Sequence, residues 1–111
     1  MFFYEKLKCY QIALELLKEV NYVQKVMPRG LGNVNDQLNR ALTSIVLNLS
    51  EGVNRKSSLD RKRFFDIAKA STSESASCFD ILFALNHLSE EKYNHFKSTL
   101  LILIKMISKL H

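Results

Sequence analysis

Six polar side chains recur every three or four residues between positions 37 and 55, a spacing that aligns them along one side of a helix. In chain order they are Gln37, Arg40, Ser44, Asn48, Glu51 and Arg55. Ser71 and Glu74 follow at helical spacing in the next segment and offer further polar partners. If the two helices pack as an antiparallel hairpin, we expect Arg40 to reach Glu74. We also expect Asn48 or Glu51 to approach the start of the later helix.

Seven of these residues form what we call the polar seam: Gln37, Arg40, Ser44, Asn48, Glu51, Ser71 and Glu74. A buried and fully satisfied network of this kind would fix the register and orientation of the two helices. A direct ligand site is the alternative. The carboxylates of Glu51 and Glu74 could do acid–base chemistry if the fold brought them together. Their positive and hydroxyl neighbours favour a structural role for both.

A second set of residues, which we call the basic cluster, could bind phosphates or an acidic partner. It consists of Arg55, Lys56, Arg61, Lys62, Arg63 and Lys69. Only Asp60 and Asp66 oppose it within the same segment. Phe64 and Phe65 occupy core-like positions there, so we expect no exposed platform for base stacking and therefore binding without sequence preference. The alternative is a solvated helix start.

Other site chemistries are not indicated. His87, His95 and His111 share no metal-ligand spacing, so we expect no metal site. No glycine-rich phosphate loop, nucleophile elbow or Cys/His pair occurs. Cys9 and Cys78 lie within helical patterns and are expected to be buried thiols in a reducing compartment, although a disulfide between them is possible. We therefore expect a non-enzymatic protein without cofactors.

The elements that must position these side chains are helices. Only three Gly and one Pro occur among 111 residues, which favours long helices, and 47% hydrophobic content indicates one globular domain over residues 1–111. Apolar periodicity predicts helices at about 3–26, 33–54, 58–88 and 90–110. Their short connections favour an all-α, up-and-down antiparallel four-helix bundle.

Local signals mark the helix ends. The segment 27–32, with Pro28 and two glycines, should end the first helix. Asn33 or Asn35 could cap the second helix, Ser57 or Ser58 the third, and Ser89 the fourth. Gly52 near the end of the second helix is explained by either a C-cap or close packing against a neighbour.

The fourth helix has a wider apolar surface than a monomeric bundle needs. Leu101, Ile102 and Met106 project away from its main apolar side and predict a subunit interface, the alternative being a broad wedge in a small bundle. The longest apolar run, 100–104, is far shorter than the roughly 20 residues of a membrane span. No secretory signal is visible after Met1. We expect a cytoplasmic protein without membrane contact, and the net charge of +5 with a pI near 9.3 makes it basic.

The chain resembles the small four-helix-bundle proteins encoded in intervening sequences of bacterial large-subunit ribosomal RNA genes. The resemblance spans almost the whole chain and rests mainly on two motifs: Gln37-x-x-Arg40-Ala41-x-x-Ser44-Ile45-x-x-Asn48-x-x-Glu51-Gly52 and Phe64-x-x-Ile67-Ala68-x-x-Ser71-x-x-Glu74. It implies a bundle that assembles into a ring-like homo-oligomer, with a homopentamer favoured. A related group is the accessory protein of diversity-generating retroelements, which works with a reverse transcriptase and nucleic acid. Ala70 departs from the glycine that the family usually has there.

Three functions remain open at this point. The leading hypothesis is a non-enzymatic module that binds RNA or another nucleic acid through the basic cluster. The second is a protein-interaction scaffold that serves as an accessory subunit for a nucleic-acid-processing partner. The third is a structural oligomer retained with a mobile genetic element and lacking a tight ligand.

Overall fold

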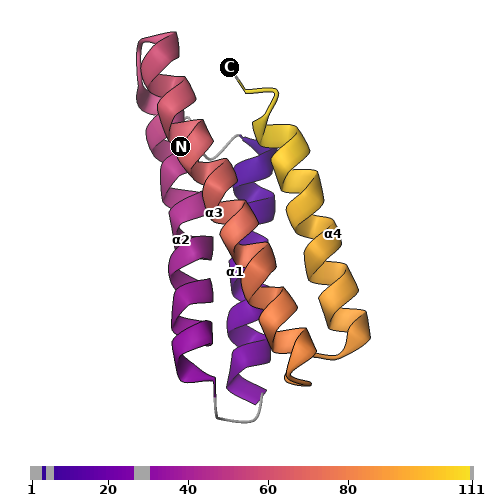
Figure 1. Cartoon of the computed structure of the whole chain (residues 1–111). Helices are drawn as coiled ribbons and strands as arrows, with labels where there is room; N and C mark the ends of the chain where they lie inside the picture. The colour runs from indigo at the N-terminus through magenta and orange to yellow at the C-terminus, as the bar shows by residue number, and fades with distance from the viewer. Residues whose placement is uncertain (1–3, 5–6, 27–30, 111) are drawn as a thin grey trace.

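The chain folds into four α-helices that run alternately up and down (Figure 1). The computed structural model describes residue 4, residues 7–26 and residues 31–110. The helices are α1 (Lys8–Val26), α2 (Gly32–Asn54), α3 (Ser58–Ala84) and α4 (Glu90–Ile107). Each helix packs against its neighbours in chain order, and α4 closes the bundle against α1. The expected all-α four-helix fold is confirmed, and the described residues contain no strand.

The helix ends differ from expectation at several points. The expected start of the first helix, residue 3, lies outside the described residues. The same holds for residues 27–30 of the expected break after that helix and for His111. α2 begins at Gly32, with Leu31 at the cap position and no side-chain capping bond, so the expected cap at Asn33 or Asn35 is wrong.

Serine caps do start the other two helices. Ser57 Oγ accepts a hydrogen bond from the Asp60 backbone N–H at 3.1 Å, and Ser89 Oγ accepts one from the Lys92 N–H at 3.1 Å. These bonds satisfy backbone donors that the first helical turn leaves free.

α3 ends four residues earlier than its apolar pattern suggests. Asn86 adopts a left-handed conformation with φ of 62°, and the His87 N–H returns to the Leu82 carbonyl at 2.8 Å. This reverse turn satisfies late carbonyls of the helix and stops its propagation. Leu85 consequently lies past the end of α3 with about half of its surface exposed.

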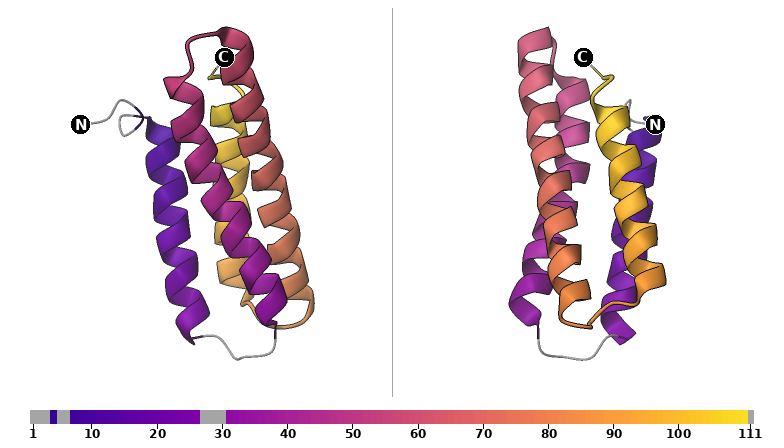
Figure 2. Two further views of the ribbon diagram at one scale, coloured as in Figure 1. Left: turned by 90° about the vertical axis from the view of Figure 1, so that its left-hand side faces the viewer. Right: turned by 45° about the vertical axis from the view of Figure 1, so that its right-hand side comes forward.

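α2 and α3 form the most extensive helix pair, and their hairpin projects beyond the ends of α1 and α4 (Figure 2). At this hairpin tip Gly52 faces the ring of Phe65. A Cβ built on Gly52 would lie 2.8 Å from Phe65 Cδ1, inside van der Waals contact. Close packing, not a C-cap, therefore explains Gly52, because α2 continues to Asn54 and Arg55 occupies the cap position.

The core side of α3 is correspondingly different from the expected one. Phe65 is fully buried, whereas Phe64 is only half-buried and Ile67 is exposed. Deeper in the hairpin, the small side chains Thr72 and Ser75 are buried and donate to carbonyls one turn earlier, at 2.8 and 2.9 Å. Small, locally satisfied side chains let α2 approach α3 closely.

Both cysteines are free and buried, so neither takes part in a disulfide. Burial raises the pKa of the Cys9 thiol and that of the Cys78 thiol, since a low-dielectric surrounding disfavours the thiolate. No helix among the described residues has the length and apolar character of a membrane span.

α4 is fastened to α3 by rings and by one polar group. Phe83 stacks on Tyr93 with centroids 4.3 Å apart. The Asp80 carboxylate accepts hydrogen bonds from Tyr93 Oη at 2.7 Å and Lys97 Nζ at 2.6 Å. Its hydrogen bonds with Lys97 and Tyr93 lower the pKa of Asp80, and the same contact with Asp80 raises the pKa of Lys97.

The Asp80 contact should make stability depend on pH in the acid range. Because the folded pKa is below the ordinary value of about 3.9, ionised Asp80 stabilises the fold above that value, and this contribution is lost as pH falls through the folded pKa. The pair is half exposed, so we expect Asp80→Asn to lower the free energy of unfolding by only about 0.5 kcal/mol at neutral pH. In urea unfolding, the difference between the two proteins should shrink as the pH is lowered below the ordinary range of an aspartate. An equal deficit at neutral and at acid pH would contradict this account.

The contact between Gly52 and Phe65 makes a second prediction. Gly52→Ala gains about 1 kcal/mol of helix propensity but overpacks a buried ring, which typically costs about 1–3 kcal/mol. We therefore expect a net loss of about 1 kcal/mol in the free energy of unfolding, measured by urea denaturation. Gly32→Ala is the matched control, because nothing lies within 4 Å of a Cβ at that position. A Gly52→Ala protein as stable as the control would show that Phe65 yields without cost.

Candidate nucleic-acid interface

The basic cluster lies at the projecting α2–α3 tip and the first turns of α3. One of its members holds the turn together. The Arg61 guanidinium donates hydrogen bonds to the carbonyl oxygens of Arg55 at 2.9 Å and of Lys56 at 3.0 Å. These bonds tie the connection between the helices to the first turn of α3. Arg61 therefore supports the shape of the tip in addition to carrying charge.

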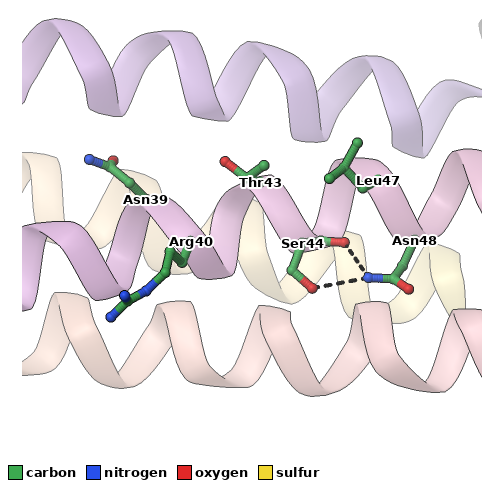
Figure 3. Close-up of a pocket in the computed structure, with 6 residues that line it drawn as sticks. All are labelled: Asn39, Arg40, Thr43, Ser44, Leu47 and Asn48. Atoms are coloured by element: carbon green, nitrogen blue, oxygen red, sulfur yellow. Dashed lines mark hydrogen bonds between the residues drawn. The ribbon is translucent and has the colours of Figure 1, made fainter.

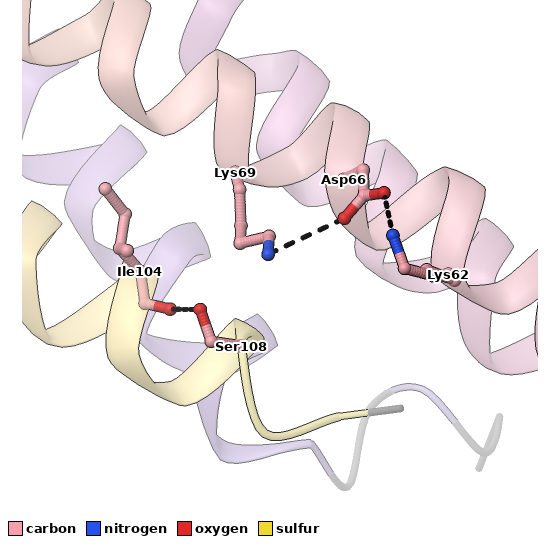
Figure 4. Close-up of polar contacts among 5 residues, drawn as sticks. All are labelled: Lys62, Asp66, Lys69, Ile104 and Ser108. Carbon is pink, nitrogen blue, oxygen red and sulfur yellow. Dashed lines mark hydrogen bonds and ion pairs between the residues drawn. The ribbon is translucent and has the colours of Figure 1, made fainter.

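Three further cations pair with carboxylates. Arg55 forms an ion pair with Glu51 at 2.8 Å. Asp66 forms ion pairs with Lys62 at 2.7 Å and with Lys69 at 3.5 Å (Figure 4). The hydrogen bond with Lys62 is the main reason that the pKa of Asp66 is lowered. Pairs this exposed add little stability, but they offset part of the positive field of the cluster.

The remaining two cations, Lys56 and Arg63, are exposed. Neither forms an ion pair with an acidic side chain among the described residues. Arg63 instead lies over the Phe64 ring, with Cζ 5.2 Å from the centroid, and Arg55 lies over the same ring at 4.6 Å. Phe64 is absent from the hydrophobic core, so the expectation that both phenylalanines serve the core is wrong for Phe64.

The polar seam connects α2 to α3 at two points. Ser44 Oγ lies 2.7 Å from Ser71 Oγ, and Gln37 Nε2 donates to Glu74 Oε2 at 3.2 Å. Both contacts join the two helices of one subunit. Only Ser71 among the seam residues is buried, so the other six are partly or fully exposed.

The remaining seam residues make local contacts. Asn48 Nδ2 donates back to Ser44, to its carbonyl at 2.8 Å and its hydroxyl at 3.0 Å (Figure 3). Arg40 points toward the α3 side of α2 in the same view. The expected contact of Arg40 with Glu74 is nevertheless wrong, because Gln37 occupies that carboxylate. Glu51 turns to Arg55, the C-cap residue of its own helix, and not to α3.

The seam borders a shallow groove of about 380 Å³ on the outer surface of α2 (Figure 3). Its lining consists of Asn39, Arg40, Thr43, Ser44, Leu47 and Asn48. These side chains include no carboxylate, imidazole or thiol, so the hydroxyls of Thr43 and Ser44 have no such general base beside them in the groove. Glu51 and Glu74 do not meet: Glu74 is bound to Gln37, which lies fourteen residues, or about 20 Å, from Glu51 along α2. The described residues hold no group of three potential metal ligands.

The apolar surface expected on α4 is present in part. Leu101 and Ile102 are 55% and 50% exposed, whereas Met106 is half-buried and packs against the core. Leu14 of α1 is also exposed at 41%, whereas its neighbours Ala13 and Leu16 are buried.

Two residues of the tip escaped the sequence reasoning: Arg61 as a clamp on the turn, and Phe64 as a partner of arginines. A signal for Phe64 exists. Successive helical residues are about 100° apart, so adjacent phenylalanines cannot both face the same core. No comparable signal predicts that Arg61 holds the turn, because its acceptors are backbone carbonyls. The sequence does not determine the shape of the turn that positions these carbonyls.

Comparison with known proteins agrees with this architecture. A protein of unknown function from the S23 ribosomal protein family of Bacteroides thetaiotaomicron VPI-5482 has a similar solved structure, with a TM-score of 0.80. The match covers 92% of this chain and 93% of that one at 19% identity, which shows the shared fold. No match to a curated protein sequence was found. The family model described as 23S rRNA-intervening sequence protein matches residues 5–109. The chain therefore belongs to the family of 23S rRNA-intervening sequence proteins.

Proposed function

We propose that this protein is a non-enzymatic, oligomeric, cytoplasmic module that binds RNA, or another nucleic acid, through the basic tip of the α2–α3 hairpin. The observation that carries the proposal is the state of Lys56 and Arg63. Both are exposed on a hairpin that projects beyond the other helices, and neither is paired with an acidic side chain of the described residues. A cation that is free of carboxylates can neutralise a phosphate and release the counterions condensed on the nucleic acid.

The rest of the tip supports this use. Arg61 holds the backbone that carries Arg55 and Lys56, so their positions are set before a ligand arrives. Lys62 and Lys69 share one carboxylate, which leaves the pair with a net positive charge. The family is described by the 23S rRNA intervening sequence, and the protein of similar structure comes from the S23 ribosomal protein family. These descriptions support the choice of ribosomal RNA as the ligand to test.

The oligomer belongs to the same proposal. A ring of copies, with five favoured from the family resemblance, would repeat the tip around a symmetry axis and multiply a charge that is modest in one chain. The exposed Leu101 and Ile102 of α4 supply the proposed subunit interface. The Met106 side chain packs within its own subunit and would contribute less.

The same exposed pair favours the second candidate, a protein-interaction scaffold that serves as an accessory subunit for a nucleic-acid-processing partner. Adjacent large apolar side chains on a helix surface are typical of a protein contact. In that case the partner, and not a second copy, would cover Leu101 and Ile102.

The nucleic-acid proposal predicts binding that depends on Lys56 and Arg63. Fluorescence anisotropy with a labelled 23S rRNA fragment should show affinity that falls roughly 20- to 40-fold between about 50 and about 200 mM salt, as expected for three phosphate contacts. The double variant Lys56→Glu/Arg63→Glu should weaken binding at least tenfold at the lower salt. Neither side chain supports the turn, so circular dichroism should show an unchanged helical content.

The matched control is Lys25→Glu/Lys92→Glu, which makes the same change in net charge at the opposite end of the bundle. We expect the control to keep most of the wild-type affinity. Equal losses in both double variants would show that only net charge matters and that the tip is not the site. Absence of wild-type binding at the lower salt would overturn the nucleic-acid proposal.

The interface proposal predicts a change of mass. Wild-type protein should elute as an oligomer in size-exclusion chromatography with light scattering, and Leu101→Glu/Ile102→Glu should release folded monomers, because a buried unpaired carboxylate is strongly unfavourable at an interface. Ile81→Glu, on the exposed surface of α3, is the control and should leave the mass unchanged. A monomeric wild-type protein at high concentration would refute the interface.

A further inference from the structure

The Phe64 ring carries two arginines. Arg55 Cζ lies 4.6 Å and Arg63 Cζ 5.2 Å from the ring centroid, both within the range of cation–π contact. The three side chains come from both sides of the hairpin turn, since Arg55 follows α2 while Phe64 and Arg63 belong to α3. They form a cluster of flat groups at the projecting tip, which we call the stacking cluster.

The stacking cluster is held in place from outside. Glu51 binds the Arg55 guanidinium at 2.8 Å, and Arg61 binds the Arg55 carbonyl at 2.9 Å. Both the side chain and the backbone of Arg55 are thereby fixed. The Arg55 side chain is still 43% exposed, and Arg63 is exposed as well. A flat, fixed and accessible guanidinium such as that of Arg55 loses little conformational entropy when a ligand stacks on it.

We propose that the stacking cluster is a site for unpaired nucleotides of RNA. A guanidinium plane and an aromatic ring both stack on nucleobases, and Lys56 beside the cluster is available for a phosphate. Paired bases in an A-form helix are already stacked, and their deep major groove excludes side chains. The site therefore selects single-stranded over double-stranded RNA. The inference rests on the proposed function and adds to it the class of RNA that the tip binds.

The charge of the tip alone would give no preference for the single strand. A duplex has a higher density of phosphates than a single strand, and purely electrostatic binding therefore favours the duplex or is indifferent. A preference for the single strand is thus a signature that a solvated basic helix start cannot produce.

The test uses a labelled, unstructured RNA of about 12 nucleotides, a length within the usual range of single-strand sites. Its binding is compared with the binding of the duplex that this RNA forms with its complement. Wild-type protein should bind the single strand more tightly than the duplex. Phe64→Leu should weaken single-strand binding about five- to tenfold, the low end of the loss of one stacked base. It should leave duplex binding unchanged.

Two further variants separate stacking from charge and from folding. Arg63→Lys keeps the charge but loses the plane, so single-strand affinity should fall while the salt dependence stays the same. Because Arg63 is exposed, this variant tests the site even if Phe64→Leu does not fold. Arg40→Lys is the control: it lies fifteen residues, or about 22 Å, from Arg55 along the helix and should change nothing.

The outcomes distinguish the inference from the function on which it rests. Equal wild-type affinity for single strand and duplex, or unchanged single-strand binding by both Phe64→Leu and Arg63→Lys, would overturn the stacking site and leave the nucleic-acid proposal standing. Wild-type protein that binds neither RNA would overturn both.

Discussion

The fit of Phe65 against Gly52 is the constraint on which the hairpin tip depends. With no side chain at position 52, the Phe65 ring enters the space between α2 and α3 and becomes fully buried. The preceding residue, about 100° around the helix, must then lie nearer the surface, and Phe64 does. Its ring lies next to the guanidinium groups of Arg55 and Arg63 and outside the hydrophobic core. A missing methyl group on one helix thus places an aromatic ring among arginines on the other.

The same tip shows why counting cations overstates a basic surface. Glu51 and Asp66 together form ion pairs with three of the six cations in the basic cluster. A fourth cation, Arg61, donates its guanidinium hydrogen bonds to backbone carbonyls. Lys56 and Arg63 are left for an external anion. One subunit therefore presents a modest field, and its affinity for phosphate depends on geometry and on repetition more than on net charge.

The sequence predicted the elements better than their partners. The 3.6-residue period was sufficient to identify four helices and to align Gln37, Arg40, Ser44 and Asn48, because these are properties of one helix. Contacts between helices depend on their relative register. Gln37 and Arg40 are one turn apart, so a shift of about 5 Å decides which of them meets Glu74. The choice between Phe64 and Phe65 likewise depended on Gly52, which the sequence left open between a cap and a packing role.

The proposed assembly and the proposed RNA binding use different surfaces and different interactions. Leu101 and Ile102 lie along α4, whereas the hairpin tip projects past the end of that helix, so an interface on α4 leaves every tip free (Figure 2). RNA that reaches several tips gains avidity from the ring, and by linkage it stabilises the ring in return. Added salt screens the phosphate contacts but does not weaken apolar burial. The RNA complex should therefore dissociate at a salt concentration that leaves the oligomer intact, whereas a protein whose charges served assembly would lose both together.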